Sequence, residues 1–163
     1  MTVHPKPDIE KRKLSDFLCF AVYSANLAFG RAYRPILSKL GLTYIQFIAL
    51  VALEEEGDQT VGALGEKLFL ESNTLTPMLK KLETAGYIRR LRDAADERQV
   101  RISLTPAGRK LRQKVVGQEV VEATGLGKDF AKVQQTMVKL RDNLLRATGD
   151  RGRSENQAGD GKS

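Results

Sequence analysis

The hydrophobic pattern of the chain changes from a helical to a strand period between residues 72 and 105, and this change restricts the fold more than any other feature. An apolar stripe with the three- and four-residue steps of a buried helix face comes first: Leu75, Met78, Leu79 and Leu82. Apolar residues that alternate with polar ones follow: Val100, Ile102 and Leu104. A helix that leads into a pair of short strands is therefore expected in the middle of the chain.

Helices are expected over most of the remaining sequence from its periodicity. Thr60 and Ser72 are positioned to cap the two helices of the middle segment, and Thr105 followed by Pro106 marks the start of the next one. Pro35 should kink or restart the first helix. The expected helices cover residues 14 to about 40, 44 to the acidic run EEEGD, 61–69, 73–86, 105 to about 122, and 130–144.

The expected strands, 87–92 and 99–105, are joined by the charged tip DAADER. The fold class is therefore mainly α with a small β-ribbon, and the order of elements over 44–105 is that of a winged helix-turn-helix. Residues 1–13 are expected to form a flexible arm, and 148–163 a disordered tail. The last helix carries a heptad-like seam suited to packing against another helix or a partner subunit: Phe130, Val133, Met137, Leu140 and Leu144.

The charge balance predicts a polyanionic partner, because 27 Lys and Arg residues oppose 20 Asp and Glu residues and give a net charge of +7. The single cysteine, Cys19, excludes an intrachain disulfide and indicates a reducing compartment. No targeting signal or membrane-length apolar run is present, so a cytoplasmic location is expected. One histidine and one cysteine cannot supply a structural zinc site, and neither a metal nor a cofactor is expected.

The second helix of a helix-turn-helix enters the DNA major groove with its N-terminal end. Its short polar residues and the lysines one turn later are candidates for base and phosphate contacts: Ser72, Asn73, Thr74, Thr76, Lys80 and Lys81. Arg92 lies in the basic ribbon, and Arg98 at the hairpin tip is suited to a narrow minor groove. The alternative is that these residues form ordinary solvated faces.

Two segments carry a resemblance to a known family. The segment GALGEKLFLESNTLTPMLKKLETAGYIRRLRDAADERQVRISLTPAGRKL resembles the winged-helix core of the MarR family of bacterial repressors, with the wing pattern D-x-x-D-E-R-x-V-x-x-x-LT-x-x-G. The segment LCFAVYSANLAFGRAYRPILSKLGLTYIQF is similar to the organic-hydroperoxide-sensing OhrR branch. The resemblance covers about residues 14 to 145 and implies a homodimeric repressor, not an enzyme, that binds a pseudo-palindromic operator and is induced by an organic hydroperoxide.

The resemblance also implies roles for individual residues. Cys19 matches the peroxide-sensing cysteine, Tyr33 and Tyr44 match tyrosines that hydrogen-bond its sulfur from the other subunit, and Tyr23 matches a third tyrosine close to it. Residues 14–43 and 106–147 would then hold the dimerisation helices. On the DNA side, the implied contacts are Ser72, Thr74, Thr76 and Lys81 in the recognition helix and Arg98 in the wing, with Asp96 bracing that arginine.

Other interpretations stay open at this point. A lone cysteine on an apolar helix face is most often a small packing residue. The same fold could serve a repressor that is released by a small apolar or phenolic ligand, a thiol peroxidase, or a protein-interaction module. The segment VVGQEVVEATGLG lacks the second cysteine that part of the OhrR branch carries. The sulfenic acid of a one-cysteine sensor would therefore react with a low-molecular-weight thiol or become over-oxidised.

Overall fold

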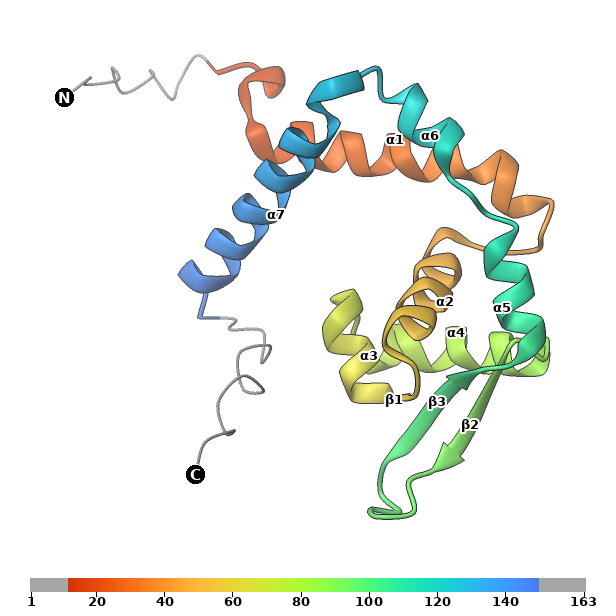
Figure 1. Cartoon of the computed structure of the whole chain (residues 1–163). Coiled ribbons are helices and arrows are strands. Elements are labelled where there is room, and N and C mark those ends of the chain that lie inside the picture. The colour runs from red at the N-terminus through yellow and green to blue at the C-terminus, as the bar shows by residue number, and fades with distance from the viewer. Residues whose placement is uncertain (1–11, 150–163) are drawn as a thin grey trace, which may run out of the picture.

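The computed structural model describes residues 12–149, which form an arch of helices with a small sheet at one end (Figure 1). The predicted tail and most of the predicted arm, residues 150–163 and 1–11, lie outside the described residues. The helices are α1 (Leu18–Ser38), α2 (Tyr44–Glu56), α3 (Val61–Leu68), α4 (Ser72–Thr84), α5 (Pro106–Gln113), α6 (Gln118–Ala123) and α7 (Phe130–Ala147). The strands are β1 (Gln59–Thr60), β2 (Ile88–Arg92) and β3 (Val100–Leu104), and two 3₁₀ turns cover Leu14–Asp16 and Gly127–Asp129.

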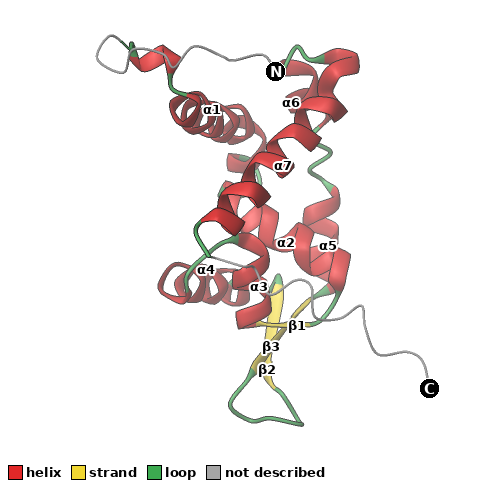
Figure 2. Cartoon of the chain, turned by 90° about the vertical axis from the view of Figure 1, so that its left-hand side faces the viewer, coloured by secondary structure: helices red, strands yellow, loops and turns green. Residues whose placement is uncertain are grey.

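The winged helix-turn-helix is confirmed in α2, α3, α4 and the sheet. Strands β2 and β3 pair antiparallel, with Ile88 opposite Leu104 and Arg92 opposite Val100. The sheet has three strands instead of the expected two, because β1 adds to the free edge of β3 and places Gln59 opposite Ile102. The hairpin projects away from the helices (Figure 2).

One hydrophobic core lies within residues 37–115. It is built from the buried faces of α2 and α4, one face of the hairpin, and single apolar residues of α1, α3 and α5. The fully buried side chains include Leu50, Leu53, Leu64, Leu79 and Ile102. The predicted stripe of α4 lies entirely inside this core, which fixes the outward face of that helix.

The first helix begins later than the periodicity predicted. The backbone at Phe17 is extended, so the helical turn Leu14–Asp16 is separate and α1 starts at Leu18. The Asp16 carboxylate accepts the Lys13 backbone N–H at 2.9 Å and therefore caps the separate turn. Pro35 does not restart the helix, because α1 continues to Ser38 and a proline removes only one backbone donor.

The helix predicted to run from 105 to about 122 is two helices. Thr105 caps α5 as expected, and its hydroxyl accepts the Gly108 N–H at 3.1 Å. Beyond Gln113 the chain leaves the helical path, and Gly117 adopts φ 71°, a left-handed conformation that favours glycine. This break turns the chain towards α6 and α7.

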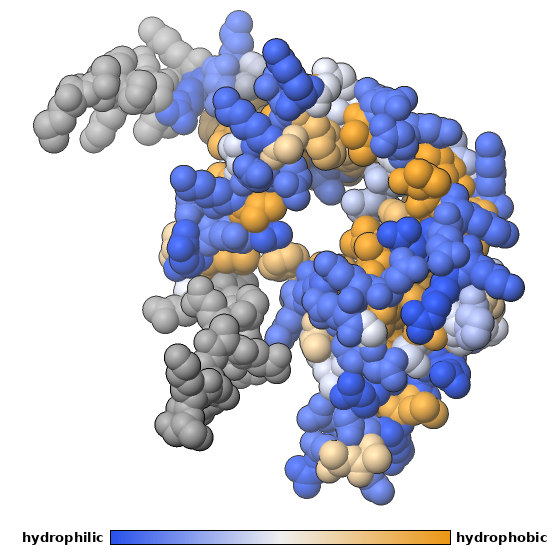
Figure 3. Space-filling view, in the orientation of Figure 1, coloured by the Kyte–Doolittle hydropathy of each residue, from blue (hydrophilic) through white to orange (hydrophobic). Residues whose placement is uncertain are grey.

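The flanking helices leave apolar side chains uncovered. Within the described residues, α1 buries only Leu37, and α7 buries none of its residues. Large apolar residues of both helices are exposed, and Figure 3 shows orange surface along the arch: Leu18, Val22, Leu27, Phe29, Met137 and Leu144. No helix in the described range 12–149 is long and apolar enough to cross a membrane.

Candidate nucleic-acid interface and thiol site

The outward face of α4 is polar at its N-terminal end and basic one turn later. All of the predicted contact residues are exposed: Ser72, Asn73, Thr74, Thr76, Lys80 and Lys81. They lie on the surface opposite the buried stripe, which anchors the helix to the core. A helix presented in this way can offer hydroxyl and amide groups to base edges and ammonium groups to phosphates.

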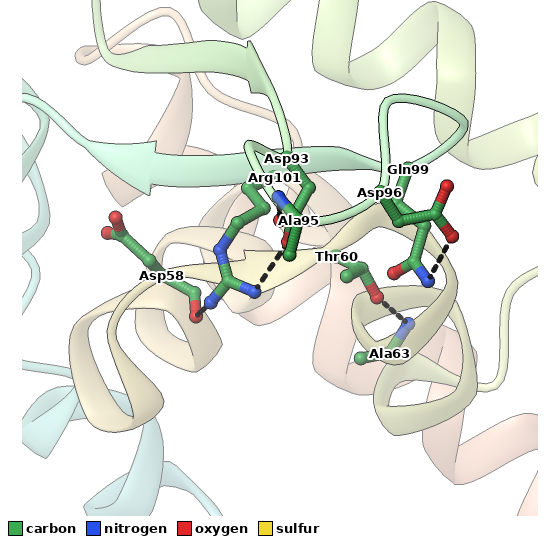
Figure 4. Close-up of polar contacts among 8 residues, drawn as sticks. All are labelled: Asp58, Thr60, Ala63, Asp93, Ala95, Asp96, Gln99 and Arg101. Carbon is green, nitrogen blue, oxygen red and sulfur yellow. Dashed lines mark hydrogen bonds and ion pairs between the residues drawn. The ribbon is translucent and has the colours of Figure 1, made fainter.

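Ser72 does not cap α4 as predicted. Glu71 occupies the N-cap position, no side chain accepts a hydrogen bond there, and Ser72 is the first helical residue. Thr60, by contrast, caps α3 as predicted, since its hydroxyl accepts the Ala63 N–H at 3.1 Å (Figure 4). The N–H groups at the start of α4 therefore have no capping side-chain acceptor.

The wing is held to the body of the domain by Arg101, as Figure 4 shows. Its guanidinium donates to the Asp93 carboxylate at 3.2 Å and to the Asp58 carbonyl at 2.8 Å. The pKa of Asp93 is lowered, first because its carboxylate accepts the Ala95 N–H and then because Arg101 is its partner. Arg101 of β3 thereby links Asp93, the residue that follows β2, to the loop between α2 and β1.

Asp96 does not brace the Arg98 side chain in the way that the resemblance implied. Its carboxylate accepts the backbone N–H of Arg98 at 3.1 Å and the side-chain amide of Gln99 at 3.2 Å. Asp96 therefore shapes the turn at the hairpin tip. The Arg98 side chain is exposed and forms no ion pair with any residue of the described range.

The basic residues of the ribbon differ in their availability. Arg92 is exposed near the end of β2, whereas Arg90 is held by Glu83 at 2.9 Å. Arg101 is paired with Asp93, so two arginines of the ribbon, Arg90 and Arg101, have acidic partners within the chain. Sequence reasoning missed the Asp93–Arg101 pair. The first aspartate of the wing pattern was the available signal for it.

Cys19 is the second residue of α1 and is exposed. It lies nearer to the helix start than expected, within the first turn, where backbone N–H groups have no intrahelical acceptors. Tyr23 lies one turn further along the same face, is 59% exposed, and approaches Phe20 at 6.4 Å between ring centroids. Cys19 is therefore not packed within the single chain, and packing of this residue between two chains stays an open alternative.

The other two tyrosines meet at the opposite end of α1. The rings of Tyr33 and Tyr44 are 5.2 Å apart, and the Phe47 ring lies 5.7 Å from Tyr33. Burial, followed by the neighbouring Tyr33, raises the pKa of Tyr44 above its ordinary value. Tyr44 therefore keeps its phenolic proton at neutral pH and remains a hydrogen-bond donor.

One chain cannot bring the cysteine to this tyrosine pair. Cys19 and Tyr33 belong to the same continuous helix. At 1.5 Å per residue, the two positions are about 21 Å apart along its axis. The structure thus joins Tyr33 to Tyr44 and leaves Cys19 with Tyr23.

A metal centre has no support in the described part of the chain, where no three His, Cys, Asp or Glu residues gather.

Comparison with known proteins gives consistent matches for this architecture. The family model of the SarA/Rot transcriptional regulators matches residues 31–115. The HTH-type transcriptional regulator TtmR of Methylorubrum extorquens is 44% identical over 143 residues, which are 86% of this chain and 73% of TtmR. The organic hydroperoxide resistance transcriptional regulator of Bacillus subtilis is 40% identical over 135 residues, or 81% of this chain and 92% of that protein.

Solved structures of AbfR are also similar. AbfR of Staphylococcus epidermidis superposes with a TM-score of 0.71 and 32% identity, covering 83% of this chain and 94% of AbfR. Overoxidized AbfR bound to DNA gives a TM-score of 0.65 and 36% identity, with coverage of 80% and 94%. The fold and the basic, outward-facing reading helix define a winged-helix transcriptional regulator. The chain belongs to the SarA/Rot family of MarR-type regulators.

Proposed function

We propose that this chain is a redox-sensing transcriptional repressor that binds operator DNA as a reduced homodimer and releases it when an organic hydroperoxide oxidises Cys19. The observation that carries the proposal is the placement of Cys19: it is exposed, in the first turn of α1, and about 21 Å along that helix from the Tyr33–Tyr44 pair. A second, antiparallel α1 would bring each cysteine to the tyrosines of the other chain.

A second copy is also supported by the uncovered apolar surface. The Leu144 side chain on α7 is 57% exposed and the Leu18 side chain on α1 is 59% exposed. Large apolar side chains exposed on two helices are typical of surfaces that contact another protein. A two-fold dimer repeats the same contacts in both chains and presents two copies of α4, which would meet DNA half-sites about 34–36 Å apart.

The proposed contacts with DNA follow from exposure and charge. Ser72, Asn73, Thr74 and Thr76 would face base edges, while Lys80 and Lys81 would neutralise phosphates. Arg98 and Arg92 would extend the contacts along the wing, with Asp96 and Asp93 fixing its shape. Such binding should weaken as the salt concentration rises.

The proposed chemistry starts with the Cys19 thiolate. The sulfur attacks the distal oxygen of the hydroperoxide and breaks the O–O bond, giving a sulfenic acid and an alcohol. The sulfenic acid then condenses with a low-molecular-weight thiol and loses water to form a mixed disulfide. Tyr33 and Tyr44 of the partner would donate hydrogen bonds to the thiolate before reaction, with Tyr23 beside it.

The mixed disulfide is the form that we expect to release DNA. AbfR has been solved on DNA both in its reduced and in its overoxidized form, so in that relative an overoxidized protein can be DNA-bound. A thiol adduct is much larger than added oxygen atoms and would separate Cys19 from the partner's tyrosines. The two copies of α4 in the dimer would then lose the spacing that the two operator half-sites require.

The test begins by selecting an operator from a random duplex library with the reduced protein. Fluorescence anisotropy on this DNA should then show tight binding, release after cumene hydroperoxide with glutathione, and recovery with dithiothreitol. A Cys19→Ser protein should bind the DNA and ignore the oxidant. Oxidant-insensitive binding by the wild-type chain, or release of the Cys19→Ser variant, would contradict the proposal.

One observation supports a second candidate that keeps the fold. The Tyr33, Tyr44 and Phe47 rings form an aromatic cluster that could contact a phenolic or apolar ligand. Release of DNA by such a compound from both the wild-type chain and the Cys19→Ser variant would favour that function. Catalytic turnover is not proposed, and sustained consumption of hydroperoxide in the presence of excess dithiothreitol would point instead to a thiol peroxidase.

A further inference from the structure

Gly117 lies where three parts of the chain meet. It occupies the break between α5 and α6, and its backbone approaches Tyr33 of α1, which in turn packs on Tyr44 and Phe47 of α2. A Cβ at position 117 would lie 3.2 Å from the Tyr33 hydroxyl oxygen and 3.8 Å from Cε1 of the ring. The phenol of Tyr33 therefore fills the space that any other residue would need.

Buried residues lie two and three positions away from the break. Val115 is 2% exposed and Val120 is 4% exposed, whereas Val116, directly before Gly117, is 82% exposed. The Gly117 carbonyl accepts the N–H groups of Val120 and Val121, each at 3.1 Å. These two hydrogen bonds fix the Gly117 carbonyl at the start of α6, next to the Tyr33 phenol.

We infer that Gly117 is a positioning residue of the proposed thiol sensor: its bare backbone and the rings of Tyr44 and Phe47 confine the Tyr33 phenol so that its hydroxyl is presented to the partner's cysteine. This inference rests on the proposed function, because it needs Tyr33 to serve Cys19 of a second chain. It adds a residue of the α5–α6 break to a sensor otherwise built from α1 and α2.

Replacement of Gly117 should therefore impair sensing without touching the cysteine or the reading helix. In Gly117→Ala the added Cβ displaces the Tyr33 hydroxyl. The rate constant for oxidation of Cys19 by cumene hydroperoxide should then fall about tenfold or more, as expected when a hydrogen bond to a charged group is lost. Sulfenic acid formation is measured by trapping with dimedone and mass spectrometry of the full-length chain.

Gly125→Ala is the matched control. Gly125 also has a positive φ, 67°, but nothing lies within 4 Å of a Cβ placed there. The two substitutions thus impose similar backbone strain, and only one meets a phenol. Gly117→Asn provides a second variant, because asparagine tolerates the left-handed conformation while still adding a Cβ.

A double-mutant cycle with Tyr33→Phe completes the design. Without the hydroxyl, the 3.2 Å contact disappears, so Gly117→Ala should have little further effect on the oxidation rate in that background. A Gly117→Ala or Gly117→Asn protein that reacts as fast as Gly125→Ala would overturn the inference. An equally large loss in the Tyr33→Phe background would also overturn it. A wild-type Cys19 that does not react at all would instead contradict the proposed function.

Discussion

The two halves of the molecule differ in what holds them together. Residues 37–115 carry the hydrophobic core, with Leu50, Leu79 and Ile102 fully buried. In the flanks, α7 buries none of its residues within the described chain, although its apolar seam is as regular as that of α4. The same pattern of apolar residues thus marks an internal core in one half and an uncovered face in the other. Residues 37–115, which we call the reading half, should therefore be stable within one chain. The flanking helices, by contrast, need a partner.

The largest expected effect comes from the core. Leu79→Ala removes a fully buried side chain and should lower the free energy of unfolding by about 2–5 kcal/mol. Chemical denaturation measures the loss, which should be the same at all protein concentrations for the transition of the reading half. Leu91→Ala, at a 62% exposed position of β2, is the control and should change little. If the loss of unfolding free energy disappeared at high protein concentration, the core would also depend on self-association. The reading half and the flanks would then not differ in this respect.

Next in size is a substitution in the flank. Leu144→Ala should weaken self-association, because each copy loses about 1.5–3 kcal/mol of burial in the proposed interface. Sedimentation equilibrium should show a higher dimer dissociation constant with an unchanged core transition. Lys139→Ala, an exposed position on the opposite side of α7, is the control. A Leu144→Ala protein that associates like the wild type would exclude this face from the interface.

A smaller effect is expected at the start of α3. Thr60→Ala removes the hydroxyl that accepts the Ala63 N–H and should cost about 1 kcal/mol of stability in the reading half. Thermal denaturation followed by circular dichroism measures this change. Thr84→Ala, in an exposed position at the end of α4, should be nearly neutral. If both threonine variants behaved alike, the cap would not contribute to stability.

The smallest expected effect is in the wing, which projects from the core. Asp93→Asn weakens the contact to Arg101 and should reduce DNA affinity by about two- to fivefold, as expected for an exposed ion pair. Glu97→Gln makes the same change of charge at the tip and is the control. Anisotropy titrations compare the two. Equal affinities in both variants would assign the effect to net charge alone.

The lowered pKa of Asp93 adds a pH dependence to that prediction. A carboxyl whose folded-state pKa lies below its unfolded value, about 3.9, stabilises the wing above that value. The contribution is lost as the pH falls through the lower folded-state pKa. The protection factors of the hairpin amides, which are corrected for the intrinsic pH dependence of exchange, should therefore fall between about pH 4 and more acidic conditions in the wild type. The Asp93→Asn protein should show no such step.

The sequence predicted the reading half well because local signals and burial agree there. The α4 stripe, the Thr60 and Thr105 caps and the alternation in β3 each point to the structure that forms. Strand β1 was missed because a segment of two residues, Gln59 and Thr60, is too short to show an alternation of apolar and polar side chains. Its pairing with β3 depends on tertiary contact. The break at Gly117 was missed because the apolar pattern continues on both sides of it.

The exposure of the candidate DNA-contact residues could be predicted from the sequence, but the partners of the charged residues could not. Exposure of the α4 residues follows from the stripe behind them, whereas the partners of charged residues do not follow from spacing. Asp96 contacts the backbone of Arg98 because the tight turn brings that N–H closer than the flexible guanidinium. The partner of Arg101 lies eight residues away across the hairpin, a contact that exists only once the strands pair.

The confinement of the core to residues 37–115 has a consequence for how such proteins diversify. Substitutions around Cys19 or along α7 alter surfaces that the fold of the reading half does not require. Substitutions in the flanks could therefore change the proposed redox input or the proposed dimer affinity while the fold of residues 37–115 persists. The segment shared across the family, 31–115, nearly coincides with that insulated half. The location of the buried leucines thus determines which segments can change without disturbing the fold of the reading half.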